Sequence, residues 1–222
     1  MRSILFDLDG TLVDSSGDLT AAVNRILADD GLAPLAVDEV TAMLGDGAGV
    51  LIARAFEQRG KTVPADGLER FRKIYEENLV VETKPYPGMV ELLRDLDAQS
   101  PRPAIAVVTN KPTFFAEKVL RELGLDVWLD DVVGPELVPE RKPAAAHVLE
   151  ALRRLDRPAA NAVMIGDGST DVLSGRRAGA QTVAVLWGYR SREQLVACEP
   201  HDVVADVDEL RAVLGVQPST LC

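Results

Sequence analysis

Four short apolar runs constrain the fold of this chain more than any other feature. They lie at 3–6, 104–108, 162–165 and 182–186. We interpret them as buried strands, because short continuous apolar runs bounded by turn residues are typical of strands in a core. From Met89 onward the runs alternate with helical patterns, which indicates an α/β fold with a doubly wound parallel sheet.

Polar and charged residues follow the first three runs. These segments are Asp7-Leu8-Asp9-Gly10-Thr11, Thr109-Asn110-Lys111-Pro112 and Gly166-Asp167-Gly168-Ser169-Thr170-Asp171. Arg141-Lys142-Pro143 lies between the second and third, and Pro143 suits the first turn of a helix. Because ligands bind outside the carboxyl ends of parallel strands, the pattern predicts one site for a phosphate and a metal.

Asp7 and Asp9 stand two residues apart where the first run opens into a loop. Two negative charges facing one site are costly unless a cation joins them or one takes a proton. A divalent metal beside Asp7, with Asp9 kept as a proton donor, satisfies both conditions. The alternative is a turn in which the two aspartates only cap the loop.

The order and spacing of these motifs resemble those of the haloacid dehalogenase superfamily of phosphohydrolases, over essentially all 222 residues. The matching motifs are Asp-x-Asp-Gly-Thr, strand-Thr-Asn, Lys-Pro and Gly-Asp-x-x-x-Asp. Gly168 departs from the serine of many members, but Asp167 and Asp171 are kept, so we expect a changed loop and unchanged chemistry. The dehalogenases of the superfamily lack the second aspartate, so Asp9 implies phosphotransfer.

The resemblance implies a catalytic role or a metal contact for each acidic residue of the motifs. Asp7 would be the nucleophile that forms an aspartyl-phosphate, and Asp9 the general acid and base, with its backbone carbonyl on the metal. Asp167 would complete the protein ligands. Asp171 would contact the metal through a water or orient Lys142; alternatively, it only stabilises a helix N-terminus. Oxygen ligands favour a hard cation, and we expect Mg²⁺.

The resemblance also implies a phosphate site. Thr109 and the Asn110 backbone would bind the phosphate oxygens that are not transferred, although both could instead cap a helix beginning near Pro112. Lys142 would pair with Asp7 and the phosphate, the alternative being a surface lysine. Lys111 and Arg141 either help with substrate charge or are solvated. We expect structural roles for the remaining notable side chains, which are His147, His201, Trp128, Trp187 and Tyr189.

The chain between the first two runs has helical spacing throughout. Its apolar positions are Leu19, Ala22, Val23, Ile26 and Leu27, then Leu51, Ile52, Ala55 and Phe56, then Leu68, Phe71, Ile74 and Leu79. We expect residues 16–81 to form an all-helical cap domain and residues 1–15 and 82–222 the catalytic core. In the resembled superfamily such an insert is a mobile cap over the substrate. An independent helical domain at this point is the alternative.

Glycines in segment 44–54 open one of these helices and expose backbone N–H groups that suit a small anion. This loop, segment 108–112 and segment 187–189 resemble those of bacterial phosphoglycolate phosphatases. We therefore expect 2-phosphoglycolate as substrate. The expected substrate-binding residues of the cap are Gly45, Asp46, Gly47 and Arg54.

Several alternatives stay open at this point. The glycines could form only a flexible turn, and Arg54 could be a solvated helix residue. An inorganic pyrophosphatase, a sugar-phosphate phosphatase or a phosphosugar mutase would use the same core. From another class, the chain could be a non-catalytic binding protein on this scaffold, although such a protein would need neither the aspartates nor Lys142.

Composition excludes some partners. A net charge of −11 argues against nucleic acid, and no apolar run is long enough to span a bilayer. The chain enters its first strand at once, so we expect no signal peptide, a cytoplasmic location, and reduced thiols at Cys198 and Cys222. The expected partner is a small anionic phosphate ester, and the expected assembly a monomer or homodimer.

Overall fold

A six-stranded parallel sheet forms the centre of the structure, a computed structural model that describes residues 2–217. The strand order is β5-β4-β1-β6-β7-β8, and every neighbouring pair is parallel. The strands are β1 (Ser3–Phe6), β4 (Ala104–Val108), β5 (Asp131–Val133), β6 (Ala162–Gly166), β7 (Gln181–Val185) and β8 (Asp202–Val204). The four predicted runs fall on β1, β4, β6 and β7, which confirms the α/β fold class.

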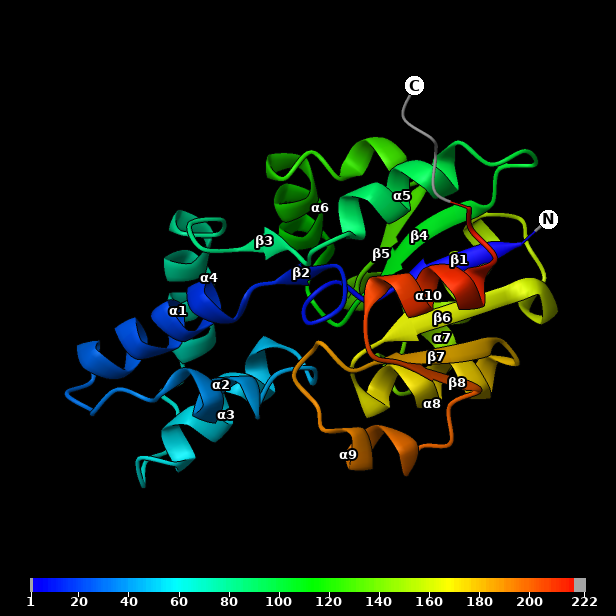
Figure 1. The fold of residues 1–222 in the computed structure, drawn as a ribbon. Coiled ribbons are helices and arrows are strands. Elements are labelled where there is room, and N and C mark those ends of the chain that lie inside the picture. Colours follow the sequence, from blue (N-terminus) through cyan, green and yellow to red (C-terminus); the bar gives the residue numbers. More distant parts are fainter. Residues whose placement is uncertain (1, 218–222) are drawn as a thin grey trace.

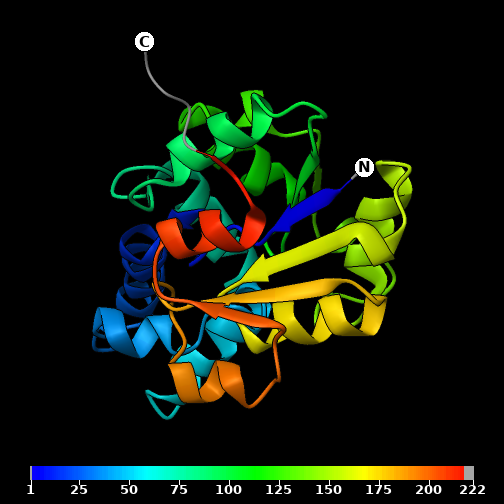
Figure 2. The same ribbon diagram turned by 45° about the vertical axis from the view of Figure 1, so that its right-hand side comes forward.

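Helices cover both faces of this sheet (Figure 1 and Figure 2). Ile4 and Phe6 of β1 belong to one apolar cluster and Leu5 to another, because alternate side chains of a strand point to opposite faces. Helices α5 (Met89–Asp97), α6 (Thr113–Glu122) and α10 (Val207–Leu214) pack in the first cluster, and α7 (Ala146–Arg154) in the second. Helix α8 (Ser169–Ala178) packs on β6 and β7, and α9 (Arg192–Val196) beside it.

Three short 3₁₀ helices lie in the connections of the core: η1 (Asp126–Trp128), η2 (Pro135–Leu137) and η3 (Ala159–Asn161). The sequence predicted that Pro143 lies in the first turn of a helix, and this prediction is wrong, because α7 begins only at Ala146. Residues 142–144 instead form a turn, which is closed by the hydrogen bond from the Ala144 amide to the Arg141 carbonyl. The turn keeps Lys142 outside the helix, and its side chain points toward the carboxyl ends of β1 and β4.

An all-helical insertion, which we call the cap, lies beyond the carboxyl ends of the strands (Figure 1). It consists of α1 (Ser16–Asp29), α2 (Val37–Thr41), α3 (Ala48–Glu57) and α4 (Gly67–Glu77). Two short antiparallel strands, β2 (Val13–Asp14) and β3 (Lys84–Pro85), join it to the core. Its apolar faces continue the large core cluster through side chains such as Leu19, Ile26 and Phe71.

The two connections between cap and core are tied together by Asp18. Its buried carboxylate accepts hydrogen bonds from the amides of Val81, Glu82 and Thr83 and from Thr83 Oγ1 at 2.6–3.1 Å. Burial raises the pKa of Asp18, but these hydrogen bonds outweigh burial and hold the pKa below its ordinary value. One side chain therefore links the segment that enters the cap to the segment that leaves it.

No helix in residues 2–217 combines the length and apolar character needed to cross a membrane. The Cys198 side chain is half-buried, and its Sγ contacts the Gln194 carbonyl at 3.5 Å. Cys222 lies outside the described residues, so the redox state of the two thiols stays a prediction.

Candidate active site

Three carboxylates meet where β1 and β6 end. One oxygen from each of Asp7, Asp167 and Asp171 lies within 4.8 Å of the others, and all three residues are buried. Burial and the charge of Asp171 raise the pKa of Asp7 to about 7, against the opposing charge of Lys142. The same two causes raise the pKa of Asp167 to about 8. Buried carboxylates this close are stable in their ionised form only beside a cation, so the donor set fits a hard divalent metal.

Backbone shape brings these carboxylates together. Gly10 has a φ of +83°, and a Cβ built on it would lie 2.4 Å from Asp167 Oδ2. A Cβ on Gly188 would lie 2.2 Å from Asp167 Cβ. The loops after β1 and β7 therefore approach Asp167 more closely than any side chain allows, and the Tyr189 amide donates to its Oδ2 at 2.7 Å.

Lys142 is buried beneath this cluster, so the alternative of a surface lysine is wrong. Its Nζ lies 2.9 Å from Asp7 Oδ1 and donates at 2.6 Å to both Asp171 Oδ1 and the Val108 carbonyl. Burial lowers the pKa of Lys142, but the charges of Asp171 and Asp7 outweigh burial and raise it, so the ammonium stays charged. His147 Nδ1 accepts from the Lys142 amide at 2.9 Å, which is a structural role that sequence alone did not connect to the site.

Burial and the charge of Lys142 lower the pKa of His147 to about 4. The imidazole is therefore neutral at neutral pH, so unprotonated Nδ1 can accept the hydrogen bond from the Lys142 amide.

Asp9 lines the first cavity and is held by two residues of the core, Ser15 and Lys111. Its Oδ1 accepts from Ser15 Oγ at 2.6 Å and from Lys111 Nζ at 2.9 Å, and Lys111 Nζ lies 3.2 Å from Oδ2. Lys111 Nζ also donates to the hydroxyl of Tyr75, from α4, at 2.6 Å. Lys111 is buried, so the solvated alternative for it is wrong; Arg141 is exposed.

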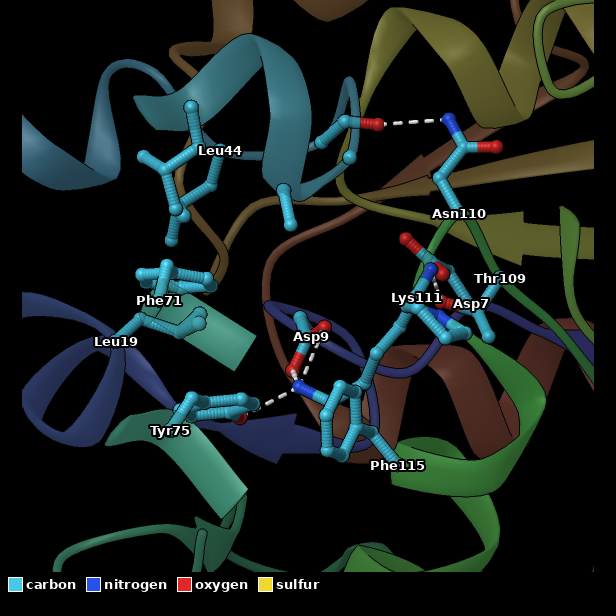
Figure 3. Close-up of a pocket in the computed structure, with 15 residues that line it drawn as sticks. Asp7, Asp9, Leu19, Leu44, Phe71, Tyr75, Thr109, Asn110, Lys111 and Phe115 are labelled. Carbon is cyan, nitrogen blue, oxygen red and sulfur yellow. Dashed lines mark hydrogen bonds and ion pairs between the residues drawn. The ribbon is translucent and has the colours of Figure 1, made fainter. Parts of the chain in front are cut away.

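Thr109 and Asn110 line a cavity together with Asp7 and Asp9 (Figure 3). We call it the first cavity. Thr109 Oγ1 accepts from the Lys111 amide at 3.1 Å, and α6 begins later, with Pro112 at its N-cap and no side-chain cap. Asn110 Nδ2 donates to the Lys142 carbonyl at 3.1 Å and to the cap's Gly45 carbonyl at 2.8 Å. The amide thus links the two strand-end loops to the cap.

The cap loop before α3 (residues 44–47) contributes to two neighbouring cavities, and Gly45 lines both. Gly45 and Gly47 line the first cavity, where α3 begins at Ala48 and leaves its first amide groups without carbonyl partners one turn earlier. Asp46 and Arg54 line a neighbouring second cavity together with Asp7, Asp9, Asp167 and Asp171. Arg54 Nη1 pairs with Asp46 Oδ2 at 2.6 Å and donates to the Met43 carbonyl at 3.2 Å.

Sequence reasoning missed Arg190, which also lines the second cavity. From the loop after β7, its guanidinium donates to the carbonyls of Thr41, at 3.0 Å, and Leu44 in the cap. The only signal was its place directly after the Trp187-Gly188-Tyr189 segment. Trp187 Nε1 donates to the Thr11 carbonyl, and His201 Nδ1 accepts from the Thr182 amide. Tyr189 lines the second cavity, so the structural roles expected for the aromatic and histidine side chains stay predictions.

Comparison with known proteins places this geometry among hydrolases. Residues 1–179 match the family model described as haloacid dehalogenase-like hydrolase. A phosphoglycolate phosphatase of Caulobacter vibrioides is 39% identical over 191 residues, which cover 84% of this chain and 80% of the relative. An N-acetylmuramic acid 6-phosphate phosphatase of Pseudomonas putida is 34% identical over 227 residues, which cover 100% and 98%. The crystal structure of a predicted phosphoglycolate phosphatase from Haemophilus somnus superimposes with a TM-score of 0.88 at 28% identity, covering 96% and 98%.

Proposed function

The chain belongs to the haloacid dehalogenase-like hydrolases and is a phosphomonoester hydrolase, and from this premise we propose that it hydrolyses 2-phosphoglycolate with Mg²⁺ as cofactor. One observation carries the proposal. Asp7 and Asp9 line both cavities beneath the helical cap, with Thr109 and Asn110 in the first cavity and Asp167 and Asp171 in the second. Buried Lys142 pairs with Asp7 at 2.9 Å. Similarity to phosphoglycolate phosphatases supports the choice of substrate.

The catalytic residues then act in two successive steps of the reaction. An Asp7 oxygen attacks phosphorus, and the P–O bond to the alcohol breaks as Asp9 gives that oxygen its proton. Asp9 next takes a proton from water, and the water oxygen attacks phosphorus to release Asp7 and inorganic phosphate. Lys142 Nζ, 2.9 Å from Asp7 Oδ1, keeps the nucleophile ionised and adds positive charge beside the phosphate. Thr109 and the backbone amide of Asn110 bind the phosphate oxygens that take no part in bond making or breaking.

Asp7, Asp167 and the Asp9 carbonyl would hold Mg²⁺. Asp171 pairs with Lys142 beside them. When bound, the cation supplies charge that offsets the phosphate oxygens in this acidic protein. The closed cap keeps water out of the first cavity, which strengthens every charge interaction there. We propose residues 16–81 as the unit that opens and closes.

Mg²⁺ should stabilise the fold, and more strongly at pH 8 than at pH 5. In the metal-free protein the pKa values of Asp7 and Asp167 rise from 3.8 to about 7 and about 8, so the folded state binds these protons more tightly than the unfolded chain. The contribution of these two groups to the unfolding free energy is complete below pH 3.8 and is lost as the pH rises through about 7 to 8. A bound cation replaces the protons on these carboxylates, so its contribution to the unfolding free energy grows as the pH rises and the protons dissociate.

The measurement is the melting temperature after chelation, with and without Mg²⁺, at both pH values. Asp167→Asn is the matched variant, and it should lose the Mg²⁺-dependent rise. Chelation should also abolish turnover, and Ca²⁺ should restore it poorly because it accepts looser geometry. Identical melting curves with and without Mg²⁺ at pH 8 would contradict the metal assignment.

The substrate proposal predicts that 2-phosphoglycolate has the highest kcat/KM in a panel of small phosphate esters. The panel should include pyrophosphate, hexose phosphates and N-acetylmuramic acid 6-phosphate, since the Pseudomonas putida relative makes the last a second candidate. Phosphate release measures turnover for every member. A clear preference for another member overturns the substrate and leaves the phosphomonoesterase standing.

A further inference from the structure

The first cavity contains a single positive charge among its described lining residues. Its walls near the cap are apolar, with Leu19, Leu44 and Phe71 facing the space (Figure 3). Its charged groups are Asp7, Asp9 and Lys111, and only Lys111 is cationic. Arginines lie in the second cavity instead, on the side of the acidic triad. An anionic leaving group in the first cavity therefore has one side chain that can offset its charge.

Lys111 stands on the core, directly after β4, but the cap fixes its position. The Tyr75 hydroxyl accepts from Nζ at 2.6 Å, and Nζ lies 4.7 Å from the centre of the same ring. Asp9 holds Nζ from the other side at 2.9 Å. An ammonium group has three N–H donors, and the longest of the three contacts of Nζ, to Asp9 Oδ2 at 3.2 Å, is the one that a ligand carboxylate would replace. Figure 3 shows the Lys111 side chain reaching between Asp9 and Tyr75.

We propose that Lys111 binds the second anionic group of the substrate and so determines specificity, with Tyr75 as its positioning residue. In 2-phosphoglycolate that group is the carboxylate, and this assignment rests on the function proposed above. A carboxylate that enters apolar walls loses its water, and the loss is tolerable only beside a fixed opposite charge. A neutral leaving group of the same size gains nothing from Lys111, so the lysine separates the two classes of substrate.

Arg54 is the competing choice, and its contacts argue against it. Its guanidinium is engaged by Asp46 and the Met43 carbonyl, and 42% of its side chain is exposed. It shares the second cavity with the acidic triad, where Mg²⁺ would lie. Lys111 has only 5% of its side chain exposed, and a buried charge is the stronger recognition element.

The experiment compares kcat/KM for 2-phosphoglycolate and for 2-hydroxyethyl phosphate, which replaces the carboxylate by a neutral alcohol. Lys111→Met keeps the length and apolar stem of the side chain but removes the charge. We expect the ratio of the two kcat/KM values to fall about 100-fold in this variant, since one charge-assisted contact is lost. Any effect that Lys111 exerts through Asp9 lowers kcat/KM for both substrates alike, so it cancels in the ratio. Lys73→Met, an exposed lysine of α4, is the matched control and should keep the wild-type ratio.

Tyr75→Phe tests the positioning role with a smaller change. It removes one hydroxyl and keeps the ring, and we expect it to raise KM for 2-phosphoglycolate about 10-fold, with little change for 2-hydroxyethyl phosphate. Melting curves check that each variant is folded. An unchanged KM in Tyr75→Phe would overturn the positioning role.

The outcomes separate this inference from the proposed function. If the wild-type protein prefers 2-phosphoglycolate and Lys111→Met loses both activities equally, the inference is wrong and the function stands. If the wild-type protein shows no preference for the carboxylate, the proposed substrate is wrong and the inference fails with it. If Lys111→Met loses the preference for 2-phosphoglycolate while the wild-type protein and Lys73→Met keep it, the result supports both the inference and the proposed function.

Discussion

Asp7→Asn should lower kcat by about 10⁴-fold or more without weakening the fold. Asparagine keeps the shape of the side chain but offers no negative oxygen to attack phosphorus. The carboxylate itself is under electrostatic stress in the metal-free protein, since burial and Asp171 raise its pKa to about 7. The contact of its Oδ1 with Lys142 Nζ at 2.9 Å offsets this stress only in part. Replacing it by a neutral amide removes that stress, so melting at pH 8 after chelation should occur at the same or a higher temperature.

Two measurements check this result. Rapid acid quenching during turnover should trap covalent phosphate on the wild-type protein and none on Asp7→Asn. Asp126→Asn, at an exposed position in η1, is the matched control for the chemical change and should retain full activity. Substantial Mg²⁺-dependent turnover by pure Asp7→Asn would refute the nucleophile.

The fold and the convergence of the strand ends were predictable because they depend on local signals. A buried run such as 104–108 determines where a strand ends, and parallel pairing places all such ends at one edge. Asp7, Thr109 and Asp167 therefore come together whatever the helices between them do. The role of Lys142 was expected from the family resemblance instead, and the turn that positions it replaced the expected helix start at Pro143.

Contacts between cap and core were not predictable in the same way. Lys111, in the loop after β4, is buried because Tyr75, which is 36 residues earlier on α4, covers it. Arg190 reaches carbonyls nearly 150 residues away, and any residue can supply a carbonyl, so no sequence pattern marks the partner. How a cap helix sits over the core depends on packing, which periodicity does not specify. The residues that we propose to determine specificity lie at this boundary, and for that reason the sequence points to the reaction class more clearly than to the substrate.

Lys142→Met should abolish turnover and also destabilise the metal-free protein, by about 3–5 kcal/mol in unfolding free energy. The ammonium is the charge shared by Asp7 and Asp171, at 2.9 and 2.6 Å, and it also satisfies the Val108 carbonyl. Its removal leaves the buried acidic triad without a cation. Denaturant unfolding after chelation measures the loss, and Mg²⁺ should recover part of it because the metal brings positive charge back to the same carboxylates.

A double variant separates the two roles of Lys142. Adding Asp171→Asn to Lys142→Met removes one of the carboxylates that the lysine neutralises, so stability should recover in part. Turnover should stay absent, because no fixed cation then adjoins Asp7 and the phosphate. If the double variant recovered activity along with stability, Lys142 would be only a structural counter-charge for Asp171. If it recovered neither, the loss in Lys142→Met would come from the vacated space and the unpaired Val108 carbonyl, and the triad's repulsion would be a minor cost.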